Sequence, residues 1–398
     1  MLFEFDPLAE QKAKLKVVGV GGAGGNAINR MISTNMEGVD FIVINTDAQD
    51  LENNAAEQKI QIGSTLTKGL GAGAQSTIGL EAMETDREAV QTLLEGADMV
   101  FITAGMGGGT GTGAAPVIAQ IARELNILTV GIVTLPFNFE GPKRMNRGLS
   151  GISEMRKACD TLLIIPNQKL MSIVDKSTTL LEAFHLADSI LNQAAKGISD
   201  LINVHGMINL DFADVETIMK NMGEAIMGTG FASGEERAVL SAQQAIASPL
   251  LDNASISGAQ GILVNITGGK GLTLHEVDEA TSIIFEEAGN DANIIFGAVI
   301  DPNLEEEIQV TVIATGFNNH KYREDSDETQ HITKAPQREV NRMLGEKINV
   351  SLSEQKNTPK EMAPEDEKPK PNILIDDDNP VIYGNDIEIP AFIRRQHE

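Results

Sequence analysis

Short apolar runs and amphipathic repeats alternate along the first half of the chain. The apolar runs predict strands, and segments whose apolar residues recur every three or four positions predict helices. The predicted strands lie at 14–20, 40–45, 98–104, 128–135 and 161–166, and the predicted helices at 26–34, 81–95 and 116–125. Most of these strands are continuous Val, Ile and Leu runs, which are typical of strands buried on both faces. The pattern therefore predicts an α/β fold, with a parallel sheet and helices on both of its faces.

A longer amphipathic repeat follows at 179–204. Its apolar residues recur at three- and four-residue spacing from Leu180 to Ile202, as in one long helix with a single buried face. The length of this predicted helix suits a central spine between two domains.

A second block of elements follows the long helix. Its predicted helices lie at 234–247 and 274–288, and its predicted strands at 261–266, 293–300 and 308–314. The order of these elements predicts a smaller α+β domain with a mixed sheet.

The hydrophobic periodicity disappears at residue 319. From 319 to 380, Lys, Glu, Pro, Asn, Gln and Asp dominate, and such a segment buries too little apolar surface to offset the entropy lost on ordering. We expect a disordered linker there. Apolar residues return beside two arginines in the terminal segment 381–398, at Ile387, Ile389, Phe392 and Ile393. They indicate a docking peptide on a long tether, and a frayed end with chance apolar residues is the alternative.

The composition narrows the classes of function. The formal net charge of -26 over 398 residues repels nucleic acid and anionic membrane surfaces, and an aromatic content of 4% is too low for base-stacking platforms. A single cysteine, Cys159, excludes an intramolecular disulfide, and the six histidines lack the spacing of a zinc site. We therefore expect no direct binding of nucleic acid and no metal-binding cluster of side chains.

The lengths of the apolar runs also indicate where in the cell the protein is located. The first 14 residues are acidic and lack the apolar run of a signal peptide, and no stretch reaches the roughly 18 to 20 apolar residues of a spanning helix. We expect a soluble cytoplasmic protein without membrane insertion.

The stretch GVGGAGGNA, at 19–27, follows one predicted strand and opens a predicted helix. Gly19, Gly21 and Gly24 match G-x-G-x-x-G, in which the backbone approaches a pyrophosphate that faces a helix N-terminus. This motif alone has low specificity. With Asp47 as a ribose-binding acid at the end of the next strand, it also fits a nicotinamide-dependent oxidoreductase.

The stretch GMGGGTGTG, at 105–113, is a second glycine-rich turn between a strand and a helix of the same sheet. Two such turns close on a polyphosphate from opposite sides, and Thr110 and Thr112 add hydroxyl donors to the backbone N–H groups. No G-x-x-x-x-G-K-[ST] occurs, so a bound triphosphate would be held by amides and Mg²⁺ rather than by a loop lysine. A third glycine-rich stretch at 69–74 is placed to cover the terminal phosphate. Glycines required only for tight turns are the alternative for each stretch.

The motifs together resemble the FtsZ family of bacterial cell-division GTPases in the tubulin superfamily. The resemblance covers nearly the whole chain through motifs in family order: KVVGVGGAGGNA, NTDAQ, GGGTGTG, TLPFNFEGPKRM, IPN, NLDFADV, SPLL, VTVIATG and IPAFIRRQ. It implies a Rossmann-like GTPase domain joined by a long central helix to a smaller α+β domain, with a disordered C-terminal tail. It further implies a GTPase that binds GTP or GDP, with Mg²⁺ held mainly through the phosphates. Such a protein polymerises head to tail and forms the cytokinetic ring at mid-cell.

The resemblance divides the chain into seven parts. A flexible segment at 1–13 precedes the GTP-binding domain at 14–178 and the central helix at 179–204. The remaining parts are the synergy loop with its helix at 205–228, the C-terminal domain at 229–318, the linker at 319–380 and the peptide at 381–398. It also implies that residues 385–398 bind membrane-tethering adaptors, such as FtsA, and assembly regulators.

The resemblance assigns phosphate and base-edge contacts to two groups of residues. The first group is Gly21, Gly22, Ala23, Gly24, Gly25 and Asn26, and the second is Gly107, Gly108, Gly109, Thr110, Gly111, Thr112 and Gly113. It places Glu140 at the ribose and Arg144 at the nucleoside. A cap on a helix that begins at Pro142 is the alternative for Glu140.

Asn167 and the long helix complete the base pocket that the resemblance implies. Phe184 and Asp188 are spaced i, i+4 and share one face of the helix. A ring that stacks beside a carboxylate accepting two guanine N–H groups selects guanine over adenine. Ordinary core packing of Phe184 and a solvated helix acid at Asp188 are the alternatives.

The segment NLDFADV, at 209–215, precedes a predicted helix. As a pattern alone, Asp211 caps that helix and Asp214 favours the dipole in its first turn. The resemblance instead makes Asn209, Asp211 and Asp214 catalytic residues that face the nucleotide of the next subunit. A nucleotide-binding scaffold that assembles without turnover is a further alternative, against which the presence of both carboxylates argues.

Overall fold

The computed structural model describes residues 12–317, except 176, 205, 207, 209, 252–255 and 290. The predicted linker, the terminal peptide and Asn209 lie outside the described residues. Within the described part of the chain, none of the helices has both the length and the apolar character needed to cross a membrane.

The amino-terminal strands form a parallel sheet in the order β3-β2-β1-β4-β5-β6. Their bounds are β1 Leu15–Val20, β2 Val39–Asn45, β3 Gln58–Gln61, β4 Met99–Gly105, β5 Leu128–Leu135 and β6 Thr161–Pro166. The chain winds outward from β1 to β3 and then returns to β4 on the other side of β1. In such sheets, ligands bind outside the carboxyl ends of the strands where the winding direction changes, here between β1 and β4.

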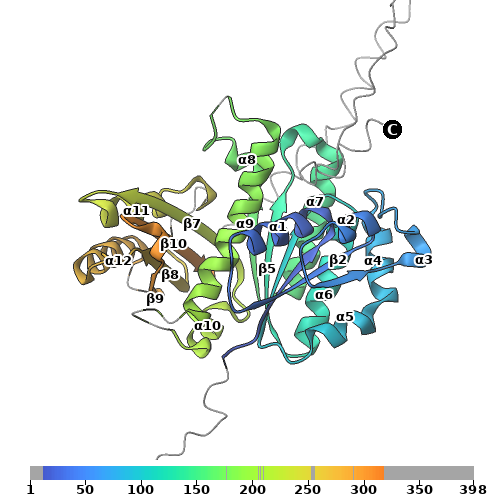
Figure 1. The fold of residues 1–398 in the computed structure, drawn as a ribbon, viewed down its shortest axis with the longest axis horizontal. Helices are drawn as coiled ribbons and strands as arrows, with labels where there is room; N and C mark the ends of the chain where they lie inside the picture. The colour runs from blue at the N-terminus through green and yellow to red at the C-terminus, as the bar shows by residue number, and fades with distance from the viewer. Residues whose placement is uncertain are drawn as a thin grey trace, which may run out of the picture. The chain divides into compact units, whose positions relative to one another are not determined.

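Helices cover both faces of this sheet, as predicted (Figure 1). Their bounds are α1 Gly21–Ser33, α2 Ala48–Glu52, α3 Ser64–Thr67, α4 Ser76–Thr85, α5 Arg87–Leu94, α6 Thr110–Glu124, α7 Pro142–Ala158 and α8 Asn167–Leu170, with a 3-10 turn η2 at Asn138–Glu140. Neighbouring strand residues contribute to different cores, because successive side chains point to opposite faces. Val17 and Phe101 pack with α1 on one face, and Val18 and Ile102 pack with α6 on the other.

Three predicted helix boundaries are wrong. Helices α1 and α6 begin inside the glycine-rich stretches, at Gly21 and Thr110, rather than at 26 and 116. Glycine has low helix propensity, so the pattern placed their first turns in loops. The single helix predicted at 81–95 is two helices that break at Asp86, whose Oδ2 accepts the Gly63 N–H at 2.7 Å.

The long central helix is confirmed as α9, Leu180–Asn203. Thr179 and Glu182 form a capping box at its start. Its 24 residues span about 36 Å. Its far end lies at the amino edge of the sheet, because Asn203 Nδ2 donates to the carbonyl of Gly38, just before β2, at 2.8 Å.

Helix α10, Phe212–Met219, follows at this amino edge. The hydroxyl of Thr161, the first residue of β6, donates to the carbonyl of Met219 at the end of α10. Figure 1 shows α10 beyond the end of α9 that is opposite to α8.

The carboxyl-terminal strands form a mixed sheet, as predicted, and their order is β7-β10-β8-β9. The elements are β7 Gly223–Ser233, α11 Arg237–Ile246, η3 Pro249–Leu251, β8 Gly261–Gly268, α12 Leu274–Ala288, β9 Asn293–Ile300, η4 Pro302–Leu304 and β10 Glu307–Thr315. The sequence did not predict β7, which contains glycines at positions 228 and 230. At both, an added Cβ would collide with a carbonyl oxygen of α11, so close packing explains these glycines.

The two sheets are continuous rather than separate. The first three residues of β7, beginning at Gly223, pair in parallel with β6 from Thr161 to Leu163. The described strands therefore form one ten-stranded sheet, with the parallel and mixed parts joined at β6 and β7.

Candidate functional site

A cavity of about 470 Å³ lies at the carboxyl ends of β1, β2 and β4. Several predicted site residues line it: Gly21, Gly22, Ala23, Asn26, Gly108, Gly109, Thr110, Gly111, Arg144, Phe184 and Asp188. The lining also includes Val20, Asn45, Asp47, Asp50, Gly71, Ala72, Gly73, Ala74 and Gly105. The structure thus brings both main glycine-rich stretches, the third one and α9 to one cavity.

Two uncapped helix N-termini meet in this cavity. Among the described residues, the N-cap positions of α1 and α6, Val20 and Gly109, provide no side-chain capping hydrogen bond, and neither first turn contains an acidic residue. By contrast, Asp47 caps α2 and Thr179 caps α9 with their side chains. The first N–H groups of α1 and α6 and their partial positive charges are therefore available to an anion.

Two glycines of the site have backbone conformations that other residues rarely adopt. Gly21 has φ +70°, and a Cβ there would lie 3.0 Å from the amide nitrogen of Gly111. Gly107 has φ +99°, and a Cβ there would lie 2.7 Å from the carbonyl oxygen of Arg144. A side chain at either position would push apart the segments that form the cavity.

Five predicted phosphate contacts do not line the cavity: Gly107, in the turn before α6, and four residues that pack behind the lining. A Cβ on Gly24 would lie 2.5 Å from the carbonyl oxygen of Thr103 in β4, so this glycine lets α1 approach the sheet. Gly113 similarly lets α6 approach α4, and Gly25 faces Asn54. The Thr112 hydroxyl accepts the Gly107 N–H at 2.9 Å and holds the turn before α6.

Glu140 and Arg144 form an ion pair beside the cavity. Arg144 Nε lies 3.0 Å from Glu140 Oε2, and the Glu140 side chain is 5% exposed. The other carboxylate oxygen, Oε1, accepts the Phe137 N–H at 2.8 Å. Glu140 thus closes its own 3-10 turn and orients Arg144. The capping alternative for α7 finds no support, because the N-cap of α7 is Gly141 and has no side-chain capping hydrogen bond among the described residues.

The first turns of α9 form one wall of the cavity. The half-buried Phe184 ring meets Phe137 edge to face, with centroids 5.5 Å apart. One turn later, burial raises the pKa of the Asp188 carboxyl to about 7, and the nearby Arg30 guanidinium partly opposes this shift. A ring beside an acceptor carboxylate suits a planar ligand with N–H donors.

Asn167, the first residue of α8, does not line the cavity. It is 6% exposed, and its Oδ1 has no hydrogen-bond partner within the described ranges. It is therefore buried outside the lining of the cavity, with one acceptor unsatisfied.

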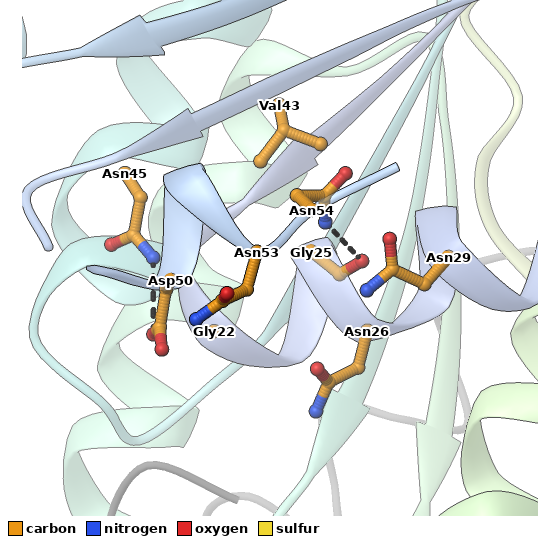
Figure 2. Close-up of a pocket in the computed structure, with 9 residues that line it drawn as sticks. All are labelled: Gly22, Gly25, Asn26, Asn29, Val43, Asn45, Asp50, Asn53 and Asn54. Atoms are coloured by element: carbon orange, nitrogen blue, oxygen red, sulfur yellow. Dashed lines mark hydrogen bonds between the residues drawn. The ribbon is translucent and has the colours of Figure 1, made fainter. Parts of the chain in front are cut away.

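A smaller polar cavity of about 20 Å³ lies between α1 and α2 and shares lining residues with the large one. Figure 2 shows the residues that line it. Asn54 Nδ2 donates to the carbonyl of Gly25 at 2.8 Å, and Asn45 Nδ2 donates to Asp50 Oδ2 at 3.4 Å. A volume of this size holds about one water molecule. These contacts fix α2, and with it Asp47 and Asp50, against α1.

Two lining residues, Asn45 and Asp50, were not predicted from the sequence. The available signal was the position of Asn45 at the carboxyl end of β2 and of Asp50 in the helix that follows it, since carboxyl ends of adjacent parallel strands meet at one edge. Both have partners in the structure, which explains their fixed positions.

Asp211 and Asp214 lie far from this cavity in the same chain. Both are exposed on α10, at the amino edge of the sheet. From Phe184, which lines the cavity, to Asn203 at the end of α9, the helix alone rises roughly 28 Å. Asp211 occupies the N-cap position of α10, yet its side chain makes no capping hydrogen bond in the described part of the chain. Asp211 therefore lacks the capping hydrogen bond that the pattern alone favoured, whereas Asp214 lies in the first turn of α10, as the pattern predicted.

The acids near the cavity do not form a cation cage. No group of three or more His, Cys, Asp or Glu that could hold a metal ion occurs among residues 12–317 where they are described. Asp47 accepts the N–H groups of Gln49 and Asp50. A divalent cation would therefore need oxygen ligands from a bound phosphate, which fits the backbone-lined cavity.

Comparisons with known proteins identify the family. The model of the Tubulin/FtsZ family GTPase domain matches residues 14–175, and that of the FtsZ family C-terminal domain matches residues 223–318. An empty FtsZ dimer from M. jannaschii is 45% identical, with a TM-score of 0.75 over 78% of this chain and 90% of that chain.

Two CetZ proteins from Haloferax volcanii share the fold at 21% identity. CetZ1, a GDP-bound monomer, has a TM-score of 0.68 over 77% of this chain and 96% of that chain. CetZ2, a GTPγS-bound protofilament, has a TM-score of 0.67 over 83% of this chain and 99% of that chain. The identity to FtsZ and the two matched domains show that the chain belongs to the Tubulin/FtsZ family and is a GTP hydrolase.

Proposed function

We propose that the chain binds GTP in the large cavity and assembles head to tail, so that Asp211 and Asp214 of one subunit complete the site of the next. One observation carries this proposal: the uncapped helix N-termini and the exposed carboxylates lie at opposite edges of the same sheet. Within one chain they cannot act on one phosphate. A neighbour related by translation along α9 brings them together.

The phosphates bind at the N-termini of α1 and α6, where Gly21 to Gly25 and Gly107 to Gly113 supply or shape the backbone. The guanine ring packs against Phe184, and Asp188 accepts its N–H groups. Asn26 completes the base pocket, the buried Asn167 supports it from outside the lining, and Glu140 and Arg144 hold the ribose side. The lining of the cavity and the Glu140–Arg144 pair support this arrangement.

Hydrolysis transfers the terminal phosphoryl group to water and yields GDP and phosphate. The neighbour's Asp211 and Asp214, with Asn209, orient the attacking water and accept its proton, while the amides of α1 and α6 stabilise the charge on the phosphate oxygens. Bound Mg²⁺ supplies charge neutralisation across the phosphates. Loss of the terminal phosphate removes contacts at the subunit interface and weakens it.

A head-to-tail contact joins different surfaces of identical subunits and forms open polymers. The dimeric FtsZ and the protofilament of CetZ2 support assembly of this kind. By family membership, the filaments form the cytokinetic ring at mid-cell in the cytoplasm. The division into a GTP-binding domain, a central helix, a C-terminal domain, a linker and a tail belongs to this proposal. So does the binding of adaptors such as FtsA, and of assembly regulators, by residues 385–398.

The test measures GTP hydrolysis and light scattering against protein concentration with Mg²⁺. We expect a critical concentration, below which specific activity is nearly absent and above which activity and scattering rise together. Specific activity that does not depend on protein concentration would contradict a site shared between subunits.

A mixing experiment tests the shared site directly. Asp214→Ala keeps the cavity but lacks one carboxylate, and Gly107→Ala keeps the carboxylates but distorts the cavity. We expect each variant alone to be nearly inactive and an equimolar mixture to recover part of the activity. A mixture no more active than its parts would place the carboxylates in the same subunit as the nucleotide.

A further inference from the structure

Thr46 joins three parts of the cavity wall, although it does not line the cavity itself. It follows directly after β2 and is fully buried, with 0% exposure. Its Oγ1 lies 2.6 Å from Oγ1 of Thr110, the first residue of α6 and a lining residue. Its carbonyl oxygen accepts the Thr67 hydroxyl at 3.2 Å and the Gly71 N–H at 3.3 Å.

The segment attached to Thr46 has an unusual backbone. Residues 68, 69, 71, 73 and 74 all have positive φ, and two of them, Lys68 and Ala74, are not glycine. Such conformations persist only where surrounding contacts hold them. The contacts with Thr46, together with the bond from the Ala48 N–H to the Gly69 carbonyl at 3.0 Å, supply that support. Gly71 to Ala74 then line the cavity close to the start of α6, where a Cβ on Gly109 would lie 2.8 Å from the Cβ of Ala72.

The pairing of the Thr46 and Thr110 hydroxyls also determines which group each hydroxyl donates its hydrogen bond to. Each hydroxyl has one proton to donate, and an ionised phosphate only accepts. If Thr46 donates to Thr110, the Thr110 proton is left to donate into the cavity. A bound phosphate selects this arrangement, and successive hydrogen bonds strengthen one another.

We infer that Thr46 is a positioning residue for the phosphate site. Its hydroxyl orients the Thr110 hydroxyl toward the ligand, and its carbonyl fixes the 67–74 segment beside the start of α6. This inference rests on the proposed binding of nucleotide phosphates at α6.

The test compares Thr46→Val, which keeps the shape without the hydroxyl, with Thr46→Ser, which keeps the hydroxyl. GTP and GDP binding are measured on nucleotide-free monomers below the concentration of assembly. We expect Thr46→Val to bind about tenfold more weakly and Thr46→Ser to remain within about twofold of the unaltered protein. Thr281→Val is the matched control, because it removes a buried hydroxyl that bonds within α12, and we expect unchanged affinity.

A double-mutant cycle shows whether Thr46 acts through Thr110. We expect Thr110→Val to weaken binding similarly, and the double variant to lose no more than either single variant. In thermal unfolding without nucleotide, Thr46→Val should lose no more stability than Thr281→Val. Added GTP should raise the Tm of Thr46→Val by less than it raises the Tm of Thr281→Val.

Three results would overturn the inference: normal binding by Thr46→Val, additive losses in the double variant, or a loss of nucleotide-free stability with unchanged affinity of the folded protein. If the unaltered protein binds no GTP, the proposed function fails as well. Binding by the unaltered protein that is insensitive to Thr110→Val overturns the inference alone.

Discussion

The carboxyl and amino edges of the parallel sheet differ in what they present. At the carboxyl edge, backbone amides and close-packed glycines form a cavity, and acids such as Asp47 and Asp50 already have partners. At the amino edge, Asp211 and Asp214 are exposed at the start of a short helix. One edge therefore has the geometry for binding an anion, and the other has exposed carboxylates, to which the proposed function assigns the activation of water. If that proposal holds, a repeating assembly completes a site that a single chain leaves divided.

The largest expected effect comes from distorting the carboxyl edge. Gly107→Ala adds a Cβ at positive φ that would lie 2.7 Å from a backbone oxygen, and we expect GTP to bind roughly 100-fold more weakly. Equilibrium binding to the monomer measures this effect. Gly271→Ala is the control, because its Cβ meets no atom within 4 Å. Near-normal binding by Gly107→Ala would show that the cavity does not depend on this turn.

Removing a carboxylate from the amino edge should separate turnover from binding. We expect Asp214→Ala to lower kcat about 100-fold while monomers bind GTP normally, because the residue lies away from its own chain's cavity. Assays above the critical concentration measure kcat. Glu216→Ala, on the same helix, is the control and should retain most activity. Weakened binding with normal turnover would assign Asp214 a different role.

Asp188 should make nucleotide binding depend on pH. Its pKa is raised from 3.8 to about 7, so the nucleotide-free fold loses stability as pH rises through this window, because the buried carboxyl must ionise. Guanine N–H donors favour the ionised form, so GTP should bind more tightly at pH 8 than at pH 6. We expect Asp188→Asn to bind about tenfold more weakly at pH 8 and to lose the pH dependence. Calorimetry at both pH values measures this, and the exposed Asp40→Asn is the control. A retained pH dependence in Asp188→Asn would exclude this carboxyl as its source.

The smallest expected effect concerns the attachment of α9 to the C-terminal domain. Lys196 Nζ lies 3.7 Å from Asp200 Oδ2 in α9 and 3.6 Å from Asp301 Oδ2 after β9. We expect Lys196→Met to lower the free energy of unfolding by about 0.5 to 1 kcal/mol at pH 8. Burial raises the pKa of Asp200 to about 6, with Lys196 opposing the shift, so the loss should shrink at pH 5, where Asp200 is protonated. Urea unfolding measures it, with Lys220→Met as the surface control. An equal loss at both pH values would show that the pairing with Asp200 contributes nothing.

The sequence predicted the sheet, the central helix and the meeting of the two glycine-rich stretches, because burial on both faces and helical spacing are visible in residue order. It did not predict where α1 and α6 begin, since an anion-binding helix start is rich in glycine and looks like a loop. It also missed β7, whose glycines serve the contact with α11 rather than strand propensity.

The sequence predicted less of the site than of the fold. The motifs indicated which stretches meet, but they did not separate lining residues such as Gly21 from packing residues such as Gly24 and Gly113. That distinction depends on which atoms approach each Cβ position, which only tertiary packing determines. Likewise, nothing in residue order shows that Thr46 lies against Thr110, because the contact joins residues 64 positions apart.

The length of α9 has a consequence for any row of identical copies. For the carboxylates of one copy to meet the cavity of the next, the axial repeat must match the separation of these two features within a chain. Helix α9, about 36 Å long, accounts for most of that separation, so its length would determine the axial repeat. Inserting one residue in α9 would lengthen the helix by about 1.5 Å and rotate the residues after the insertion by about 100°. Every contact between the carboxylates of one copy and the cavity of the next would then be misaligned.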